Sequence, residues 1–271
     1  MANDCLVTKL KGVVQNDNLP YLNTVCFDFI AKTGDSDIDD AVLMVVVSSN
    51  KTCKIFSVGG TFTVGDQSTP VNEYVASQGS YSTIKAYSDG AFKLYIEKDA
   101  IKGFGAEGST NKTKRYNLDI SQLDYADALE IINLKRTEVH GEFKPELNQN
   151  IRQLQLMNSN FNINLENIQY TSNFETFVVT DCNYIIGNIN NLYKNINLTN
   201  IDVRACPNII GQLEEFCRLM ATQKDSTITH LTFLGDRTGI TYQGALIPVN
   251  TAYDITFDQS LPNGYSITVQ S

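Results

Sequence analysis

The chain has 271 residues, of which 42% are hydrophobic, and 30 acidic residues outnumber 21 basic ones to give a formal net charge of −9. This length suggests one or two domains of ordinary size, with enough apolar residues for a real core. Because binding to nucleic acid or to an anionic membrane depends on basic residues near phosphate, the acidic balance argues against both kinds of partner.

The first residues contain no apolar segment of the kind found in secretory signals. The longest apolar run, Ala41–Val47, is far too short to span a bilayer and predicts a buried strand. We therefore expect a soluble protein made in cytoplasm, in which the six cysteines are free thiols.

Residues 4–108 consist of short β-rich runs separated by polar or glycine-containing breaks. Several runs alternate apolar and polar residues, as Phe92, Leu94 and Ile96 do. Runs of this length between turn signals are typical of an antiparallel sandwich or barrel. The predicted strands lie within residues 5–14, 24–32, 41–49, 53–60, 82–90 and 91–98. We expect an antiparallel β-sandwich over residues 1–112.

The acidic run Asp35–Asp40 begins like a calcium loop, with carboxylates at alternate positions. An EF-hand loop also needs Gly at its sixth place and Glu at its twelfth, where this chain has Asp40 and Val46. The run is either a weak cation contact or an acidic loop at a strand end, and the sequence leaves this open.

The run Gly103–Gly108 matches the dinucleotide-binding pattern GxGxxG. That site requires a strand before the glycines and a helix after them, with the pyrophosphate at the helix N-terminus. No helical periodicity follows here, so we expect an interdomain loop and no cofactor.

After about residue 116 a pattern of the form L-x-x-L-x-L recurs. Its starts lie 22, 23, 24 and 30 residues apart, which matches the leucine-rich-repeat period of roughly 20–29 residues except at the last step, where an insertion is expected. The pattern predicts a short solenoid over residues 113–271. The apolar triplets are Leu129/Ile132/Leu134, Ile151/Leu154/Leu156, Phe174/Phe177/Val179, Leu198/Ile201/Val203 and Ile228/Leu231/Phe233.

A small residue follows each triplet by three positions, and we name this set the turn ladder. A side chain that turns inward where a strand ends can cap the turn by hydrogen bonding to backbone. A cysteine metal or redox pair is the alternative, but two thiols without further ligands make a poor zinc site. Gly187 and Gly211 follow two of these residues and predict a tight bend. The turn ladder is Thr137, Ser159, Cys182, Cys206 and Asp236.

The residues between the apolar positions should project from the exposed face of the stacked strands, where repeat proteins usually bind partners. A plain solvated sheet is the alternative. The predicted binding face is Asn133, Lys135, Gln153, Gln155, Thr176, Val178, Asp202, Arg204, His230 and Thr232.

Two further elements complete the repeat half. Residues 214–220 read as one short amphipathic helix, and residues 252–269 as a closing β-hairpin with an Asn-Gly turn at Asn263 and Gly264. The two histidines, His140 and His230, have no nucleophile partner that spacing would nominate. We therefore expect no enzyme, no catalytic residue and no metal.

Two stretches resemble known proteins. The opening Cys5–Phe29 and the repeat Leu129–Phe143 together resemble proteins of gut Bacteroidales that carry BspA-like leucine-rich repeats, and more particularly those of the crAss-like bacteriophages. In these phages a β-domain followed by a short repeat array is similar to virion structural or fibre components.

The resemblance implies a non-enzymatic virion component: a capsid decoration, head fibre or tail-associated protein. Its sandwich would be an anchor, and its repeats would contact other virion proteins or further copies of the chain. It would be assembled in the host cytoplasm. The alternative is a bacterial cell-surface recognition module that binds glycan or protein through the repeats.

Overall fold

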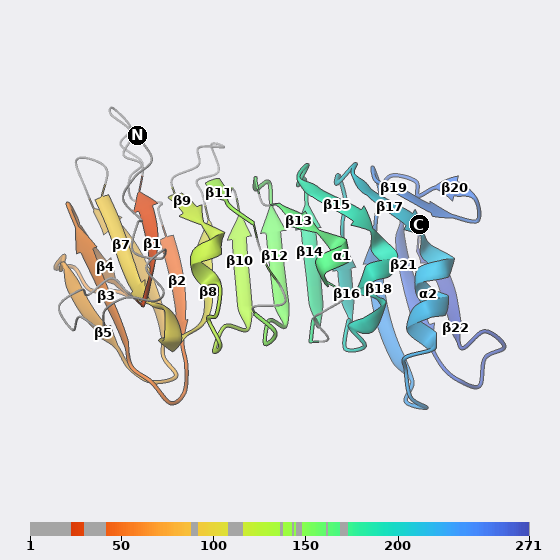
Figure 1. Ribbon diagram of the computed structural model, residues 1–271, viewed down its shortest axis with the longest axis horizontal. Helices are drawn as coiled ribbons and strands as arrows, with labels where there is room; N and C mark the ends of the chain where they lie inside the picture. The colour runs from red at the N-terminus through yellow and green to blue at the C-terminus, as the bar shows by residue number, and fades with distance from the viewer. Residues whose placement is uncertain are drawn as a thin grey trace, which may run out of the picture. The chain divides into compact units, whose positions relative to one another are not determined.

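The computed structural model describes residues 23–29, 42–87, 92–107, 116–135, 138–142, 144, 148–160, 162–168 and 173–270. In these residues the chain is mainly β, with several sheets and a few short helices (Figure 1). It divides into two compact units: unit 1 is Met1–Leu129 with Arg136–His140, and unit 2 is Glu130–Lys135 with Gly141–Ser271. A compact unit is not the same as a folding domain, so the domain division after residue 112 stays a prediction.

Unit 1 contains mostly antiparallel strands in two layers. The strands of the first layer, in the order β11-β9-β1-β7-β3-β5, are Glu138–His140, Tyr116–Asp119, Thr24–Phe29, Phe92–Glu97, Cys53–Val58 and Glu73–Ala76. Those of the second, in the order β8-β2-β6-β4, are Ile101–Glu107, Val42–Val47, Tyr81–Tyr87 and Thr61–Val64. One 3-10 turn, η3 at Lys98–Ala100, joins β7 to β8, and a second, η4 at Ile120–Leu123, follows β9.

The two layers of unit 1 share one apolar core. The rings of Phe27 on β1 and Phe104 on β8 lie 5.8 Å apart at 75°, a favourable edge-to-face contact. Leu43 and Val45 on β2 are fully buried. Because β1 and β8 belong to different layers, these contacts place the layers face to face.

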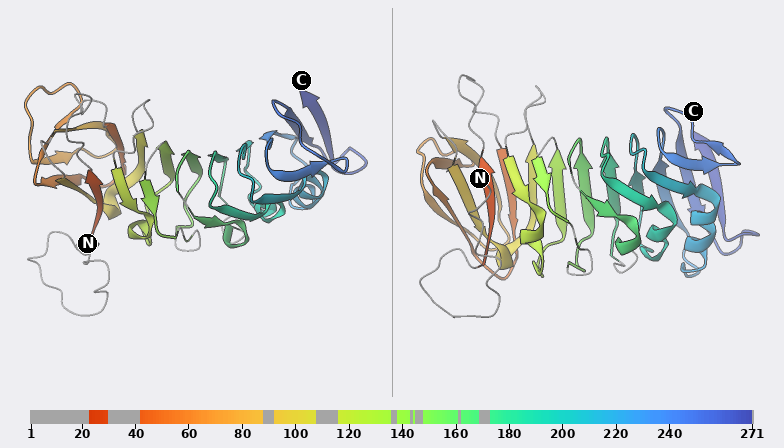
Figure 2. Two further views of the ribbon diagram at one scale, coloured as in Figure 1. Left: turned by 90° about the horizontal axis from the view of Figure 1, so that it is seen from above. Right: turned by 45° about the horizontal axis from the view of Figure 1, so that its top comes forward.

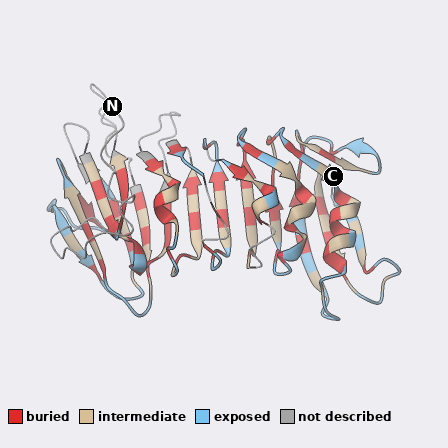
Figure 3. Cartoon of the chain, viewed as in Figure 1, coloured by how far each residue is buried: buried red, intermediate tan, exposed pale blue. Residues whose placement is uncertain are grey.

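Unit 2 is built on a ladder of parallel strands, which we name the ladder strands: β10 (Ile131–Lys135), β12 (Gln153–Met157), β14 (Thr176–Thr180), β16 (Asn200–Asp202) and β18 (Thr229–Leu234). Each strand pairs in parallel with the next, in the order of the chain. Because the sequence returns the same classes of residue at each strand, the register places apolar side chains beside apolar ones. One fully buried row consists of Ile132, Leu154, Phe177, Ile201 and Phe233. Figure 3 shows buried positions alternating with less buried ones along the ladder strands.

A second row of strands lies across the core from the ladder strands (Figure 2). It has the order β13 (Ile163–Asn164), β15 (Ile185–Asn188), β17 (Ile209–Gln212), β19 (Gly239–Tyr242) and β20 (Ala245–Leu246). A short helix follows each of β13, β15 and β17, and neighbouring helices are in contact. These helices are α1 (Leu165–Ile168), η6 (Ile189–Lys194) and α2 (Leu213–Ala221). No helix in the described residues is long and apolar enough to cross a membrane.

A hairpin ends the unit. Strand β21 (Ala252–Phe257) pairs antiparallel with β18, and β22 (Tyr265–Gln270) pairs antiparallel with β21. The hairpin and the helix predicted at residues 214–220 are both confirmed. Gly264 has φ +73°, in the left-handed region that favours glycine, but the connection spans residues 258–264 and is longer than a two-residue turn.

The predicted strands of unit 1 are confirmed in the described residues, as β1, β2, β3, β6 and β7. The strand expected at residues 5–14 lies outside them. The expectation of a loop at Gly103–Gly108 is wrong through Glu107, because β8 covers Ile101–Glu107 and pairs with β2. Glycine is uncommon in strands. The backbone of Gly103, Gly105 and Ala106 nevertheless pairs with β2 like that of Phe104 between them.

Candidate interaction surface on the ladder strands

Residues between the buried positions of the ladder strands form two outward rows. Strand register makes each row a line of side chains about one strand spacing apart, about 4.8 Å. The first row is Ile131, Gln153, Thr176, Asn200 and Thr232, and the second is Asn133, Gln155, Val178, Asp202 and Leu234. Amide and hydroxyl groups predominate in the first row, so this part of the face can donate and accept hydrogen bonds at regular spacing.

One ion pair gives the face a fixed charged feature. The guanidinium of Arg204 donates through Nε to Oδ1 of Asp202 at 2.9 Å and through Nη2 to Oδ2 at 2.6 Å. The Asp202 side chain is only 9% exposed, whereas that of Arg204 is 41% exposed. The hydrogen bond and charge of Asp202 raise the pKa of Arg204. The pair therefore neutralises a carboxylate that is largely removed from water.

A second charged group lies at the N-terminal ends of the ladder strands. Arg152 precedes β12, and Glu130 and Glu175 precede the strands on either side of it. The Arg152 Nε donates to Glu175 Oε1 at 3.0 Å, and its Nη1 lies 3.8 Å from Glu130 Oε2. Sequence reasoning missed this group, although the signal was there: a positive residue between two negative ones at the same place in successive repeats.

The remaining predicted face residues differ in position. Lys135 pairs with Met157, which in turn pairs with Thr180, at the C-terminal ends of the three strands. The spacing of the triplets aligns His230 with Asn200. The register instead pairs Asn200 with Thr232, so His230 lies two residues N-terminal to the first row. Its Nδ1 lies 3.2 Å from Oγ1 of Thr256 on β21. The register also shifts the fifth triplet by two residues, since Phe233 pairs with Ile201, and Ile228 is 57% exposed rather than buried.

Three turn-ladder residues occupy the same local geometry. Each is at most 3% exposed, and each side chain reaches the carbonyl oxygen two residues before it: Ser159 that of Met157 at 3.3 Å, Cys182 that of Thr180 at 3.3 Å and Cys206 that of Arg204 at 3.7 Å. Two of them also reach back one repeat. Ser159 Oγ lies 3.4 Å from the oxygen of Leu134, and Cys206 Sγ lies 2.9 Å from that of Val179. Thr137 lies outside the described residues.

A left-handed residue comes directly before each of these side chains. Asn158, Asp181 and Ala205 have φ of 50°, 54° and 56°. The amide of Asn158 donates to the oxygen of Thr180, and that of Asp181 to the oxygen of Arg204, both at 3.0 Å. Left-handed φ is less favourable for these residues than for glycine, although Asn and Asp tolerate it well, and the bond stabilises the turn.

The same bond defines where the ladder continues. The amide of Ala205 donates to the oxygen of Asp236 at 3.0 Å, and the next residue, Arg237, has φ of 55°. By this alignment Thr238, not Asp236, takes the place of Cys206 in the last repeat. The hydroxyl of Thr238 donates to the oxygen of Gly235. The insertion in the last repeat moves the ladder two residues from where spacing alone put it.

Asp236 has a different role in the turn. Its side chain is 2% exposed, and its Oδ2 accepts from the amide of Asn250 at 2.9 Å. Its Oδ1 lies 3.5 Å from Nε of Arg237. Asp236 therefore ties the loop before β21 to the end of β18.

Gly187 and Gly211, which follow Cys182 and Cys206, have the positive φ and the close neighbouring atoms that a tight bend requires of glycine. Gly187 has φ +116° and Gly211 has φ +136°. A Cβ at Gly211 would lie 2.6 Å from Oδ1 of Asn188 and 2.8 Å from Cγ2 of Ile189. At Gly187 the nearest atoms, of Asn164 and Leu165, would be 3.2 Å away. The close approach of Asn188 and Ile189 leaves room for hydrogen alone at Gly211.

The cysteines of the turn ladder are protonated thiols in a dry setting. Burial raises the pKa of Cys206 to about 12 and that of Cys182 to about 11. Both are free thiols, as are Cys53 and Cys217. In the part of the chain that the structure describes, no group of three or more His, Cys, Asp or Glu residues is placed to hold a metal ion. The Asp35–Asp40 run lies outside that part.

Comparison with known proteins gives no family. No protein-family model matches the chain, and no curated protein sequence is significantly similar to it. The outward rows, the Asp202–Arg204 pair and the turn geometry are therefore the observations on which a function has to be built.

Proposed function

We propose that the chain is a non-enzymatic structural component of a phage virion, in which unit 2 is a leucine-rich-repeat solenoid and unit 1 a β-sandwich anchor. The observation that carries this proposal is the parallel, in-register ladder of β10, β12, β14, β16 and β18. Such a ladder buries one side of every strand and leaves the other as a regular face, the part that repeat proteins use for partners. The virion role comes from the resemblance of Cys5–Phe29 and Leu129–Phe143 to crAss-like phage proteins.

The turn geometry supports the solenoid. In a stacked array each repeat contacts only its neighbours, so the bonds at one repeat should recur at the next. The amides of Asn158, Asp181 and Ala205 make the same bond to the following repeat. The glycines Gly187 and Gly211 recur with it.

The outward rows are the proposed contact surface for other virion proteins. Their groups are mostly uncharged, and the one buried carboxylate, Asp202, is paired with Arg204. A face of this kind loses little through desolvation of charges when another protein covers it. Contacts on it would be specified by amide and hydroxyl groups at fixed spacing.

Mass spectrometry of purified particles tests the role. The sample is a phage whose genome encodes this chain, and the expected result is the chain at many copies per particle. A photo-crosslinking residue at Gln155, on the outward face, should then link to another virion protein. The same residue at Glu166, exposed on α1, is the matched control and should give no such link. A chain absent from washed particles would overturn the proposal.

A second candidate function is recognition of glycan or protein at a bacterial surface. The first outward row favours it, because Gln153, Thr176, Asn200 and Thr232 present amide and hydroxyl groups of the type that bind sugar hydroxyls. Binding of the isolated chain to intact host cells, lost on Gln153→Ala and Thr176→Ala together, would support this function. The particle measurement separates the two.

A further inference from the structure

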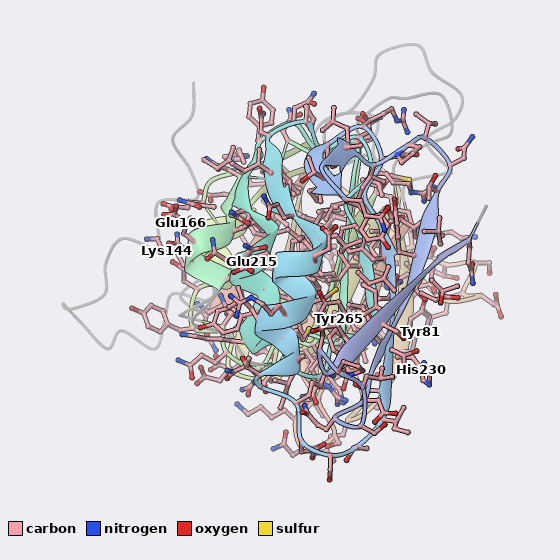
Figure 4. All side chains as sticks on the ribbon, turned by 90° about the vertical axis from the view of Figure 1, so that its right-hand side faces the viewer. Tyr81, Lys144, Glu166, Glu215, His230 and Tyr265 are labelled. Carbon is pink, nitrogen blue, oxygen red and sulfur yellow. The ribbon has the colours of Figure 1, made fainter. Side chains whose placement is uncertain are left out.

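Strand β22 ends one sheet of unit 2 and has a free edge. It pairs with β21 on one side and is the last strand in the order of its sheet among the described residues. Figure 4 looks toward this end of unit 2 and labels Tyr265, the first residue of β22. A free edge presents unpaired amides and carbonyls and can pair with a strand of another chain.

Other edge strands in the described residues are shorter or partly protected. Strands β13 and β20 have two residues each, and β11 has three. Strand β5 carries Glu73, which pairs with Lys54. Strand β4 is bridged beyond its edge through Phe62 and Val71. Strand β22 has six residues and none of the devices that block edges: its sequence YSITVQ lacks charge, proline and glycine.

Backbone geometry tells which groups of β22 are free. The amide of Asp258 donates to the oxygen of Gly264 at 3.0 Å, at the start of the hairpin. Antiparallel pairs alternate between bonded and non-bonded positions. Counting from this bond, Ser266, Thr268 and Gln270 bond to β21, and the amides and carbonyls of Tyr265, Ile267 and Val269 point to the free edge.

We propose that two copies of this chain pair through β22, antiparallel, about a two-fold axis at Ile267. In this register Ile267 faces its own copy, and Tyr265 faces Val269 of the second copy. Every free amide and carbonyl of these three residues then has a partner. A two-fold axis at Ser266 or at Thr268 would leave some of these groups unpaired. The number of backbone hydrogen bonds between the two copies of β22 therefore favours the register centred on Ile267.

The side chains agree with this register. Opposed residues in a sheet lie on the same face, so the apolar side chains of Tyr265, Ile267 and Val269 would form one cross-strand cluster with their copies. Val269 is 49% exposed, while Tyr253, its partner on β21, is 2% exposed. A second copy would cover the apolar edge that β21 and α2 leave open.

Charge on the strands of the sheet does not oppose the pairing, although the chain carries −9. The nearest acidic residue on the sheet is Asp254 of β21, opposite Thr268. Three strand spacings, about 14 Å, would separate it from its copy across the sheet, and a two-residue offset along the strands adds to this distance. This exceeds the Debye length of about 8 Å at physiological ionic strength, so their repulsion is largely screened.

Light scattering coupled to size-exclusion chromatography tests the pairing on the full chain. The wild-type chain is expected at twice the mass of one chain, in a concentration-dependent equilibrium. Ile267→Lys puts two like charges opposite each other at the axis and should give a monomer. Thr268→Lys adds the same charge to the same strand, but opposite Ser266 of the copy, and should stay a dimer.

A charge exchange fixes the register. Ile267→Lys and Ile267→Glu should each be monomeric, and an equimolar mixture should give a heterodimer, because the two residues meet at the axis. Far-ultraviolet circular dichroism and urea midpoints close to wild type show that each variant is folded. A wild-type monomer at all concentrations, or dimers that persist in Ile267→Lys, would overturn the proposal. The pairing does not depend on a virion role. Mass spectrometry of purified particles tests that role separately.

Discussion

The Sγ of Cys206 lies 2.9 Å from the carbonyl oxygen of Val179, the last apolar residue of the triplet in the repeat before its own. Cys206 and Val179 are both fully buried. A buried carbonyl needs a donor, since water cannot reach it. The side chain thus links two repeats at the point where the chain leaves a strand.

Replacing Cys206 separates hydrogen bonding from size. Cys206→Ser keeps a donor of smaller volume and should lower the free energy of unfolding only slightly. Cys206→Leu adds bulk where the repeats touch and removes the donor, and should cost roughly 1–3 kcal/mol. Urea midpoints of the two variants check this. Equal losses would show that the thiol has no role in the turn.

Glycine substitutions test the close approach of repeats. Gly187, Gly211 and Gly244 all have positive φ, so the backbone of an alanine is strained at each of these positions. Gly211→Ala also places a Cβ 2.6 Å from Asn188, and Gly187→Ala one 3.2 Å from Asn164, whereas Gly244→Ala meets nothing within 4 Å. The expected loss of stability, measured by thermal unfolding, is largest at Gly211, smaller at Gly187 and smallest at Gly244, where it should be about 1 kcal/mol.

A different order among these glycines has a clear meaning. If Gly244→Ala costs as much as Gly211→Ala, backbone strain alone sets the loss and the repeats are not in close contact at Gly211. Gly244 is a fair control because it lies in the same unit and in a turn between strands.

Period and composition were enough to predict the strands and the small buried residues of the central repeats. Leu154, Phe177 and Ile201 are buried as their triplets imply, because a repeated pattern needs no knowledge of distant contacts. Gly187 and Gly211 were also found, since only glycine suits a bend of that kind.

The last repeat could not be predicted in the same way. Its register depends on pairing between Ile201 and Phe233, which the inserted residues obscure. Spacing therefore nominated Asp236 in place of Thr238. The left-handed residue Arg237 reveals the alignment only in the folded chain. The Arg152 group was missed for another reason: its residues contact across repeats, and a single repeat shows just one charge.

The Asp202–Arg204 pair should contribute more than an exposed pair does. Arg204→Met would leave a carboxylate that is 9% exposed without its cation, and should cost about 1–2 kcal/mol after allowance for the exposure of Arg204. Arg152→Met is the matched control: the Arg152 side chain is 51% exposed, so water screens its ion pairs and its loss should cost less than that of Arg204. Urea unfolding of both variants measures the difference, and equal costs would contradict it.

Asp202→Asn completes a double-mutant cycle with Arg204→Met. Once the carboxylate is neutral, loss of the guanidinium should matter less, so the double variant should be more stable than the sum of the single losses predicts. Additive losses would mean that Arg204 contributes through packing of its apolar stem and not through the ion pair.

Alkaline pH should weaken the fold through the turn-ladder thiols. In the unfolded chain a cysteine ionises near its ordinary pKa of 9.0, whereas burial raises the pKa of Cys182 to about 11 and that of Cys206 to about 12. The folded state therefore holds these protons at pH values where the unfolded state releases them. The contribution of each thiol to the free energy of unfolding is complete below pH 9 and is lost as pH rises toward 11–12. The loss is up to about 1.4 kcal/mol per pH unit for each thiol.

Urea midpoints between pH 8 and 10.5 check this slope, with Cys182→Ser/Cys206→Ser as the comparison. Serine does not ionise in this range, so the double variant should lose stability less steeply than the wild type while other alkaline titrations stay the same. Ser159→Ala is the control, because it alters the same ladder without removing a titrating group, and its slope should match that of the wild type. Identical slopes in all three chains would show that the two thiols are open to ionisation in the folded state, against the burial found at the turn.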